Sequence, residues 1–226
     1  MRVKICGNRS GDEIRLAAQA GADAVGLIVG IRHRTEDSLD IDTAAGLLAA
    51  TPVFVSTVLV THRIYADEIL DIHRHVPTST IQLHDDIGDD QIKLLKERLP
   101  KVPLIKAVHV VDEGAIDDAG IFSPLVDALL LDSRTADRIG GTGIVHDWSI
   151  SARIVSAAEK PVILAGGLTP DNVVEAIRCV KPYAVDVNSG VEFPDGSKAP
   201  DKVRKFVATA KSETAAAYDT ELRQPA

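Results

Sequence analysis

The sequence predicts an α/β protein with a closed (β/α)8 barrel, the TIM-barrel architecture, in a single domain. Short β-branched apolar runs alternate with amphipathic or Ala- and Leu-rich segments, and eight such pairs follow one another along the chain. Parallel strands need crossover connections, so this alternation favours a parallel sheet with the helices outside it. Glycine-rich segments follow the last three predicted strands, where barrels of this type commonly bind phosphate. An open doubly wound sheet is the main alternative, and it usually has a different strand count.

The elements follow from these patterns in order. The predicted strands cover residues 3–6, 24–29, 53–60, 80–83, 104–110, 128–132, 162–165 and 184–187. The predicted helices cover residues 12–20, 42–50, 66–75, 89–99, 113–119, 147–158, 170–180 and 198–217. Thr169 and Pro170 mark the start of the seventh helix, because Thr is a good N-cap and Pro fits the first helical position. We expect the barrel to span residues 1–212, followed by a C-terminal tail over 213–226 that is a frayed helix end or disordered.

Composition excludes several classes of protein. The 226 residues are 45% hydrophobic, which is ample for a folded core. The net charge is −8 and no basic tract occurs, so we expect no nucleic-acid partner. Apolar stretches fall short of the roughly 20 residues that span a membrane, and the N-terminus has no signal-peptide pattern. We therefore expect no membrane partner and a cytoplasmic protein, in which Cys6 is a free thiol because two cysteines make no disulfide framework.

Three glycine-rich segments predict a phosphate site. Glycines let backbone N–H groups approach an oxyanion closely, and a following helix adds a favourable dipole. Each segment alone is weak evidence, since glycine also serves to turn a chain, but three on consecutive units point to an anion. The phosphate-binding candidates are Gly141, Thr142, Gly143, Gly166, Gly167, Asn188, Ser189 and Gly190.

Cys6 is the first candidate catalytic residue. It ends the first predicted strand, and period-two alternation puts Lys4 on the same face of that strand. With that face inward, Lys4 lies below the thiol, and barrel closure makes Asp186 on the last strand its partner. A nearby ammonium favours the thiolate, so we expect the pKa of Cys6 to lie below its reference of about 8.5. The alternative is that Cys6 is a small buried apolar residue.

Asp132 is the second candidate, because it follows an apolar run at the end of the sixth strand. An unpaired carboxylate is costly to bury, so Asp132 either meets solvent at the barrel mouth or has a function, and a turn aspartate is the alternative. Gln82 and His84 share one face at the end of the fourth strand, and we expect both to bind substrate. Capping a loop is the alternative for His84. Lys106 is expected to point into the barrel and to pair with a carboxylate.

Taken together, these segments resemble the phosphoribosylanthranilate isomerase family over about residues 2–210. The resemblance is carried by KICG at 4–7, GADAVG at 21–26, QLH at 82–84, LLDS at 130–133, GGTG at 140–143, AGGL at 165–168 and VDVNSGVE at 185–192. It implies a barrel enzyme of tryptophan biosynthesis that needs no cofactor or metal and acts on a phosphorylated aminosugar. It further implies that Asp132 is the general acid, that Cys6 is the general base, and that the enzyme is a monomer or homodimer.

The segment after the second strand departs from the family pattern. The family usually has a Ser-Pro-Arg-aromatic stretch there, whereas residues 30–38 read GIRHRTEDS. We expect Arg32 or Arg34 to meet the substrate's carboxylate, with a solvated charged loop as the alternative. Asp85 replaces a usual glycine, and His62 lies where asparagine is common. These differences lie on the aromatic side of the expected substrate.

Three alternatives to the implied activity stay open. The first is the same fold acting on a different phosphorylated aminosugar, which the altered segment after the second strand would permit. The second is a phosphometabolite-binding barrel without catalysis. The third is an aldolase in which Lys4 or Lys106 forms a Schiff base with a carbonyl substrate.

Overall fold

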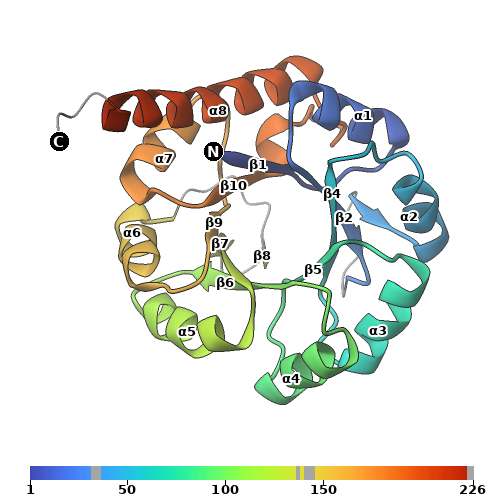
Figure 1. Ribbon diagram of the computed structural model, residues 1–226. Helices are drawn as coiled ribbons and strands as arrows, with labels where there is room; N and C mark the ends of the chain where they lie inside the picture. The colour runs from blue at the N-terminus through green and yellow to red at the C-terminus, as the bar shows by residue number, and fades with distance from the viewer. Residues whose placement is uncertain (32–36, 136–137, 140–145, 223–226) are drawn as a thin grey trace.

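The strands form a closed ring with helices around its outside (Figure 1). The computed structural model of the chain describes residues 1–31, 37–135, 138–139 and 146–222. Neighbouring strands pair in parallel in the order β1, β10, β9, β7, β6, β5, β4, β2, and β2 pairs back with β1. The predicted (β/α)8 barrel is therefore confirmed.

The barrel strands are β1 (Arg2–Ile5), β2 (Ala24–Val29), β4 (Ser56–Thr61), β5 (Thr80–Leu83), β6 (Leu104–Val110), β7 (Ala128–Thr135), β9 (Val162–Leu164) and β10 (Ala184–Val187). The helices are α1 (Gly11–Ala20), α2 (Ile41–Leu48), α3 (Ala66–His75), α4 (Asp89–Arg98), α5 (Gly114–Phe122), α6 (Trp148–Ala157), α7 (Val173–Val180) and α8 (Pro200–Leu222), with short 3₁₀ turns η1 (Ser123–Leu125) and η2 (Ser189–Val191). Two short strands lie off the ring: β3 (Ser38–Leu39) extends β2 in parallel, and β8 (Arg138–Ile139) makes a hairpin with β7.

Local sequence explains how several helices begin. Ser10, Asp40 and Asp147 each accept a hydrogen bond from a first-turn backbone N–H, the standard N-cap contact of α1, α2 and α6. The start of α7 differs from the prediction, because the helix begins at Val173 and Asn172, rather than Thr169, is its cap residue. Residues 170–172 form a turn ahead of it.

Other predicted boundaries change as well, and β7 continues to Thr135 rather than ending at residue 132. The third barrel strand begins at Ser56 rather than residue 53, because Pro52 and a left-handed Phe54 with φ of 72° interrupt extended backbone. The last helix runs from Pro200 to Leu222, so much of the predicted tail is helical, and residues 223–226 lie outside the described part. In the described part of the chain, every helix is too short or too polar to cross a membrane.

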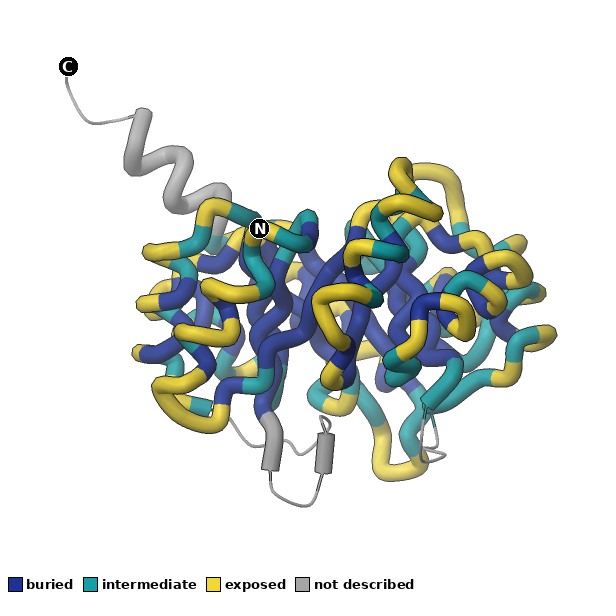
Figure 2. Tube along the Cα trace, turned by 90° about the horizontal axis from the view of Figure 1, so that it is seen from below, coloured by how far each residue is buried: buried dark blue, intermediate teal, exposed yellow. Residues whose placement is uncertain are grey.

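Strand alternation divides the core into two layers. Side chains on the outer face of the strands pack under the helices in one large apolar cluster that includes Val3, Val25 and Leu129. Two smaller clusters fill the barrel interior, and the first lies around Ile105 and Leu130. The second cluster comprises Cys6, Ile28, Val58 and Val60. Figure 2 shows the result, with buried strands inside and exposed residues on the outer helix faces.

Lys106 does not point into the barrel. Its neighbours Ile105 and Ala107 belong to an interior cluster, so Lys106 faces the helix layer. There its ammonium lies 4.8 Å from the ring centre of Phe122 on α5 and donates to the Ala107 carbonyl oxygen. The inward orientation expected from the sequence is wrong because the alternation of β6 is opposite to the one assumed.

Candidate active site

The carboxyl ends of the barrel strands surround a pocket with about 590 Å³ of empty space, including its open mouth. All nine predicted site residues that lie in the described part of the chain line this pocket. They are Cys6, Gln82, His84, Asp132, Gly166, Gly167, Asn188, Ser189 and Gly190. Five others, Arg32, Arg34, Gly141, Thr142 and Gly143, lie outside the described residues. Cys6 and Asp132 therefore face one cavity.

Lys4 and Asp186 form an ion pair at the base of this pocket. The two residues are register neighbours on β1 and β10, and Lys4 Nζ lies 2.6 Å from Asp186 Oδ2. Both side chains are almost fully buried, so the pair neutralises two charges that would be costly alone. Burial lowers the pKa of Lys4, but the Asp186 carboxylate and Cys6 together outweigh this effect and the pKa is raised. The predicted partnership is confirmed, and a lysine held protonated in this way is a poor Schiff-base nucleophile.

The aldolase alternative loses both of its candidate lysines. Lys4 is bound to Asp186, and Lys106 lies outside the barrel against Phe122. The pocket-lining residues of the described chain include neither lysine.

Cys6 is a buried thiol whose pKa burial raises to about 11. The Lys4 and Lys198 ammonium groups act in the opposite direction, and the Asp186 carboxylate adds to the rise. The expectation of a lowered pKa is therefore wrong, because Lys4 is already neutralised by Asp186 and the cost of burying a thiolate dominates. The free enzyme holds Cys6 as a thiol at neutral pH.

Gly26 on β2 makes room for this thiol, and the sequence analysis did not single it out as a site residue. A Cβ at position 26 would lie 2.7 Å from Cys6 Sγ and 3.2 Å from Lys4 Cε. Glycine inside a strand often marks a place where another group approaches the backbone closely. The glycine within the apolar run 24–29 was the signal that could have revealed this contact.

Asp132 is a buried carboxyl whose pKa burial raises to about 7. The Ser133 backbone N–H donates to Asp132 Oδ1 at 2.8 Å and limits the rise, while the Asp186 carboxylate adds to it. Gly166, with a left-handed φ of 78°, lies directly against this group, since a Cβ there would be 2.9 Å from Asp132 Oδ1. A carboxyl with this pKa is half protonated near neutral pH, as a general acid requires.

Gln82 and His84 form a hydrogen-bonded chain that ends at Asp132. Burial, with smaller contributions from His109 and His62, lowers the pKa of His84 well below its ordinary value, so the ring is neutral. Gln82 Nε2 donates to His84 Nδ1 at 3.1 Å, and a neutral ring that accepts at Nδ1 carries its proton on Nε2. That proton points to Asp132 Oδ2, 3.4 Å from Nε2.

His146 fixes the strand end beside Asp132 from the other side, a role that the sequence analysis missed. Ser133 Oγ lies 3.0 Å from His146 Nδ1, and His146 Nε2 lies 2.7 Å from Ser151 Oγ on α6. Burial lowers the pKa of His146 to about 4, so this ring also stays neutral. Nothing in the sequence pattern separates His146 from an ordinary loop histidine.

Two glycine turns that line the pocket lie against each other. Gly166 and Gly167, which follow β9, both have left-handed φ values. Gly190, in the turn η2 after β10, fits against the Leu168 carbonyl so closely that any side chain there would collide with it. The two turns therefore form one continuous backbone surface, as expected for anion binding.

The fold and these side chains define a class of protein: a (β/α)8-barrel enzyme whose pocket places a buried thiol and a buried carboxyl beside two glycine turns. Comparison with known proteins is more specific. The family model described as N-(5′-phosphoribosyl)anthranilate (PRA) isomerase matches residues 3–209. The chain belongs to this family.

Relatives and solved structures agree with this assignment. N-(5′-phosphoribosyl)anthranilate isomerase 2 of Methanosarcina mazei is 43% identical over 94% of this chain and 95% of its own length. The Haloferax volcanii isomerase is 43% identical over 97% of each chain. The crystal structure of the Thermotoga maritima enzyme superposes with a TM-score of 0.84 at 33% identity, covering 94% of this chain and 99% of that one. Another such structure, 31% identical with a TM-score of 0.80, is a complex with reduced 1-(o-carboxyphenylamino)-1-deoxyribulose 5-phosphate, and the shared region is 94% of this chain and 99% of that chain.

Proposed function

We propose that the chain converts N-(5′-phosphoribosyl)anthranilate into 1-(2-carboxyphenylamino)-1-deoxyribulose 5-phosphate, an isomerisation of tryptophan biosynthesis. The observation that carries this proposal is the placement of Cys6 and Asp132 in one pocket with two glycine turns. Membership of the family supports the same reaction. The finer expectations of a cytoplasmic location and a monomeric or homodimeric state stay predictions.

Asp132 and Cys6 divide the proton transfers of this reaction. The Asp132 carboxyl gives its proton to the ribose ring oxygen as the C1′–O bond breaks, which leaves a protonated Schiff base. Cys6 then removes the C2′ proton to give an enolamine, and protonation at C1′ with loss of the C2′ hydroxyl proton yields the ketone. The cationic Schiff base favours the thiolate, so it offsets part of the raised pKa of Cys6. Each positioned group typically contributes about 10²–10⁴-fold in rate.

Two buried oxygens support sugar binding in this pocket. Gln82 Oε1 and Asp186 Oδ1 have no hydrogen-bond partner within the described structure, although both residues line the pocket. Buried acceptors without partners cost free energy, so a ligand that donates to them gains affinity. The ribose hydroxyls carry such donors. The glycine turns hold the phosphate at the other end, which fixes the sugar between acid and base.

The aromatic end of the substrate lies toward His62 and His84. Their rings stack at 5.1 Å between centroids, and both line the pocket. A flat stacked pair suits the face of an anthranilate ring. Arg32 and Arg34 stay the predicted cations for its carboxylate.

Replacement of the acid and the base tests the proposal. Cys6→Ala and Asp132→Asn should each lower kcat for N-(5′-phosphoribosyl)anthranilate by at least about a hundredfold while circular dichroism stays that of the wild type. Cys179→Ala, at an exposed cysteine, is the matched control and should keep full activity. The wild-type gene should also restore growth of a tryptophan auxotroph lacking this isomerase. Wild-type rates in either active-site variant, or failure of complementation, would contradict the proposal.

A further inference from the structure

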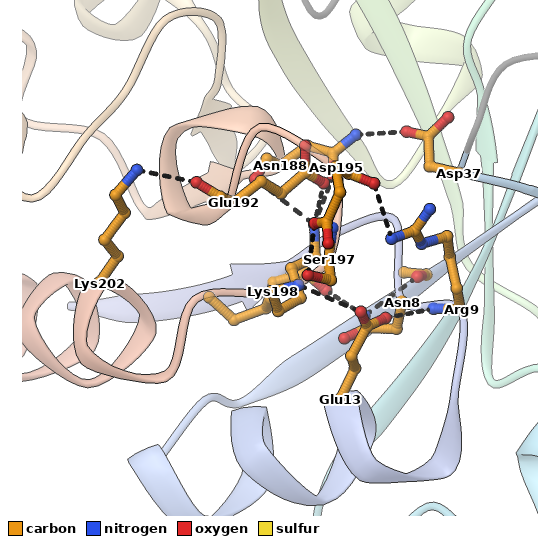
Figure 3. Close-up of polar contacts among 12 residues, drawn as sticks. Asn8, Arg9, Glu13, Asp37, Asn188, Glu192, Asp195, Ser197, Lys198 and Lys202 are labelled. Carbon is orange, nitrogen blue, oxygen red and sulfur yellow. Dashed lines mark hydrogen bonds and ion pairs between the residues drawn. The ribbon is translucent and has the colours of Figure 1, made fainter.

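A buried lysine lies behind the phosphate side of the pocket without lining it. Lys198 precedes α8, and its side chain has no exposed surface. Its ammonium donates to Asn188 Oδ1 at 2.6 Å, to Glu192 Oε1 at 2.6 Å and to the Asn188 carbonyl oxygen at 3.4 Å (Figure 3). A buried ammonium requires such partners, because an unpaired charge is costly in the protein interior. Two of the three acceptors belong to Asn188.

Lys198 sets the orientation of the Asn188 amide. An amide has one acceptor end and one donor end, and an ammonium binds the acceptor end alone. With Oδ1 on Lys198, the Nδ2 group faces the other way and donates to Asp37 Oδ2 at 2.6 Å (Figure 3). The amide also packs against Gly7, where a side chain would collide with Asn188 Oδ1. Gly7 follows Cys6 and has a left-handed φ of 67°.

This bridge crosses the end of β1. In the barrel, β1 lies between β10 and β2. Asn188 follows β10, whereas Asp37 precedes β3, which pairs with the end of β2. The hydrogen bond from Asn188 to Asp37 therefore connects the two neighbours of β1 at the point where Cys6 ends that strand. The turn η2, one wall of the anion site, begins at the next residue after Asn188.

We propose that Lys198 is a positioning residue for the phosphate site: its buried ammonium orients Asn188, which ties η2 to Asp37 across the end of β1. The inference rests on the proposed function for the identity of the substrate, and on the contacts of Lys198, Asn188 and Asp37 for the role itself. Lys198 acts through Asn188, because it is absent from the lining of the pocket.

The expected effect separates binding from chemistry. Without the ammonium, Asn188 Oδ1 and the Asn188 carbonyl oxygen lose their buried donor, so the Asn188 side chain is held only by its bond to Asp37 and the turn loses one of its two anchors. Cys6 and Asp132 keep their own supports, which are the bond from Cys6 N to the Val187 carbonyl oxygen and the bond from Ser133 N to Asp132. The Michaelis constant should therefore rise about tenfold, the size of one charge-assisted hydrogen bond, while kcat falls by a smaller factor, because the Lys198 ammonium also favours the Cys6 thiolate.

A neutral double variant avoids leaving a lone buried carboxylate. Lys198→Met alone would strand Glu192, whose side chain is largely buried, and such a loss can unfold a protein. Lys198→Met with Glu192→Gln removes both charges together. Lys202→Met is the matched control, because exposed Lys202 donates to the Glu192 carbonyl oxygen in the same region and, within the described structure, not to Asn188.

The experiment compares the Lys198→Met/Glu192→Gln variant, Asp37→Ala, their combination and Lys202→Met. We would measure KM and kcat for N-(5′-phosphoribosyl)anthranilate, the Kd of inorganic phosphate by calorimetry, and thermal unfolding. The first two variants should each raise KM and the phosphate Kd about tenfold, and their combination should raise them no further, because both break one bridge. The control should stay within about twofold of the wild type.

Several outcomes would overturn the inference. An unchanged phosphate Kd in a folded Lys198→Met/Glu192→Gln variant would do so, as would independent, multiplicative effects of the two changes. If that variant does not fold, Asp37→Ala is the remaining test. An unchanged phosphate Kd in Asp37→Ala would then show that the bridge does not contribute to phosphate binding. Phosphate binding needs no turnover. A wild type that binds phosphate but converts no N-(5′-phosphoribosyl)anthranilate would contradict the proposed function and leave the role of Lys198 intact.

Discussion

Burial acts on Cys6 and Asp132 in the same direction, whereas their proposed roles need opposite protonation states. It raises the pKa of Asp132 to about 7, which suits an acid, and that of Cys6 to about 11, which opposes a base. The active form, with a thiolate and a protonated carboxyl, is therefore a minor form of the free enzyme. Two groups in one site titrate as a pair, so the pH dependence of the rate belongs to both.

The first prediction is the shape of the pH–rate profile. The active form carries one proton on the pair, as does the dominant form between about pH 7 and 11. We expect kcat/KM to rise with pH up to about 7 and then to stay level, because the ratio of the two singly protonated forms is constant there. Steady-state kinetics between pH 5 and 9, chosen as about two units on either side of the Asp132 pKa, measures this. If kcat/KM instead declines above pH 7 and does not fall at acidic pH, the rate follows protonated Asp132 alone, and Cys6 is not the base.

The second prediction concerns stability. The pKa of Asp132 is about 7 in the folded protein, above the 3.8 of an ordinary aspartate, so protonation of Asp132 favours the folded state. This contribution to the free energy of unfolding is fully present below pH 3.8 and is lost as pH rises through 7. Asp132→Asn removes this loss and keeps an acceptor for the Ser133 N–H. Its free energy of unfolding relative to wild type should therefore grow by about 4 kcal/mol between pH 4 and pH 8. Urea unfolding at both pH values checks it, and a difference independent of pH would contradict the raised pKa.

At the residue scale, the sequence placed Cys6 and Asp132 in one pocket but did not predict their acidity. Cys6 and Asp132 were identifiable because each ends an apolar strand, and strand alternation correctly paired Lys4 with Asp186. The pKa of Cys6 was predicted in the wrong direction, because it depends on how completely the thiol is buried and on whether Lys4 is already neutralised. Both are properties of packing that one strand does not encode.

At the scale of elements, the glycine turns after β9 and β10 do more than bend the chain. Gly166 occupies a left-handed conformation and lies against the backbone of Ser133, so it connects the end of β9 to the end of β7. The contact places one wall of the anion site beside Asp132. Sequence alone predicts a phosphate site at these glycines, but the contact between strands that are far apart in the sequence required coordinates.

The third prediction uses this contact. Gly166→Ala introduces a Cβ at a φ of 78° and against Ser133, so we expect a loss of about 2–3 kcal/mol in the free energy of unfolding and much lower kcat/KM. Gly46→Ala is the control, because nothing lies within 4 Å of its Cβ in α2. That change should stabilise the protein by about 0.5–1 kcal/mol and leave activity unchanged. Chemical denaturation and steady-state kinetics measure both, and equal effects of the two variants would contradict the argument.

Element boundaries show where sequence patterns fail. The run from residue 53 reads as strand by composition, yet Phe54 is fully exposed and left-handed there, and β4 begins at Ser56. Lys106 was assigned to the wrong face of β6, because apolar residues occupy both faces of a buried parallel strand and leave the alternation ambiguous. Which face points inward is decided by the register with β5 and β7.

On the scale of the whole molecule, the barrel is closed by its first and last strands. The β1–β10 contact carries the Lys4–Asp186 ion pair in the interior, where both side chains are almost fully buried. The closed ring itself was predictable, because eight strand–helix units in a chain of this length leave few other arrangements.

The fourth prediction tests this closure. Lys4→Met leaves Asp186 buried without its partner and should cost about 3–5 kcal/mol in the free energy of unfolding. Lys4→Met combined with Asp186→Asn should recover most of that loss. Arg153→Met, which breaks an exposed ion pair with Glu113, is the control and should cost less than about 1 kcal/mol. Urea denaturation measures all three, and a double variant as unstable as the single one would show that charge pairing is not the reason.

The same closure has a consequence for synthesis on the ribosome. The bond between Lys4 and Asp186 joins residues 182 positions apart, so the first strand must wait for the last before the ring exists. At about 5–20 residues per second, that interval is roughly 10–40 seconds. Throughout it, the Cys6 sulfur of the nascent chain is open to solvent and to oxidants. The thiol becomes shielded and weakly acidic when translation has delivered the strand that completes its surroundings.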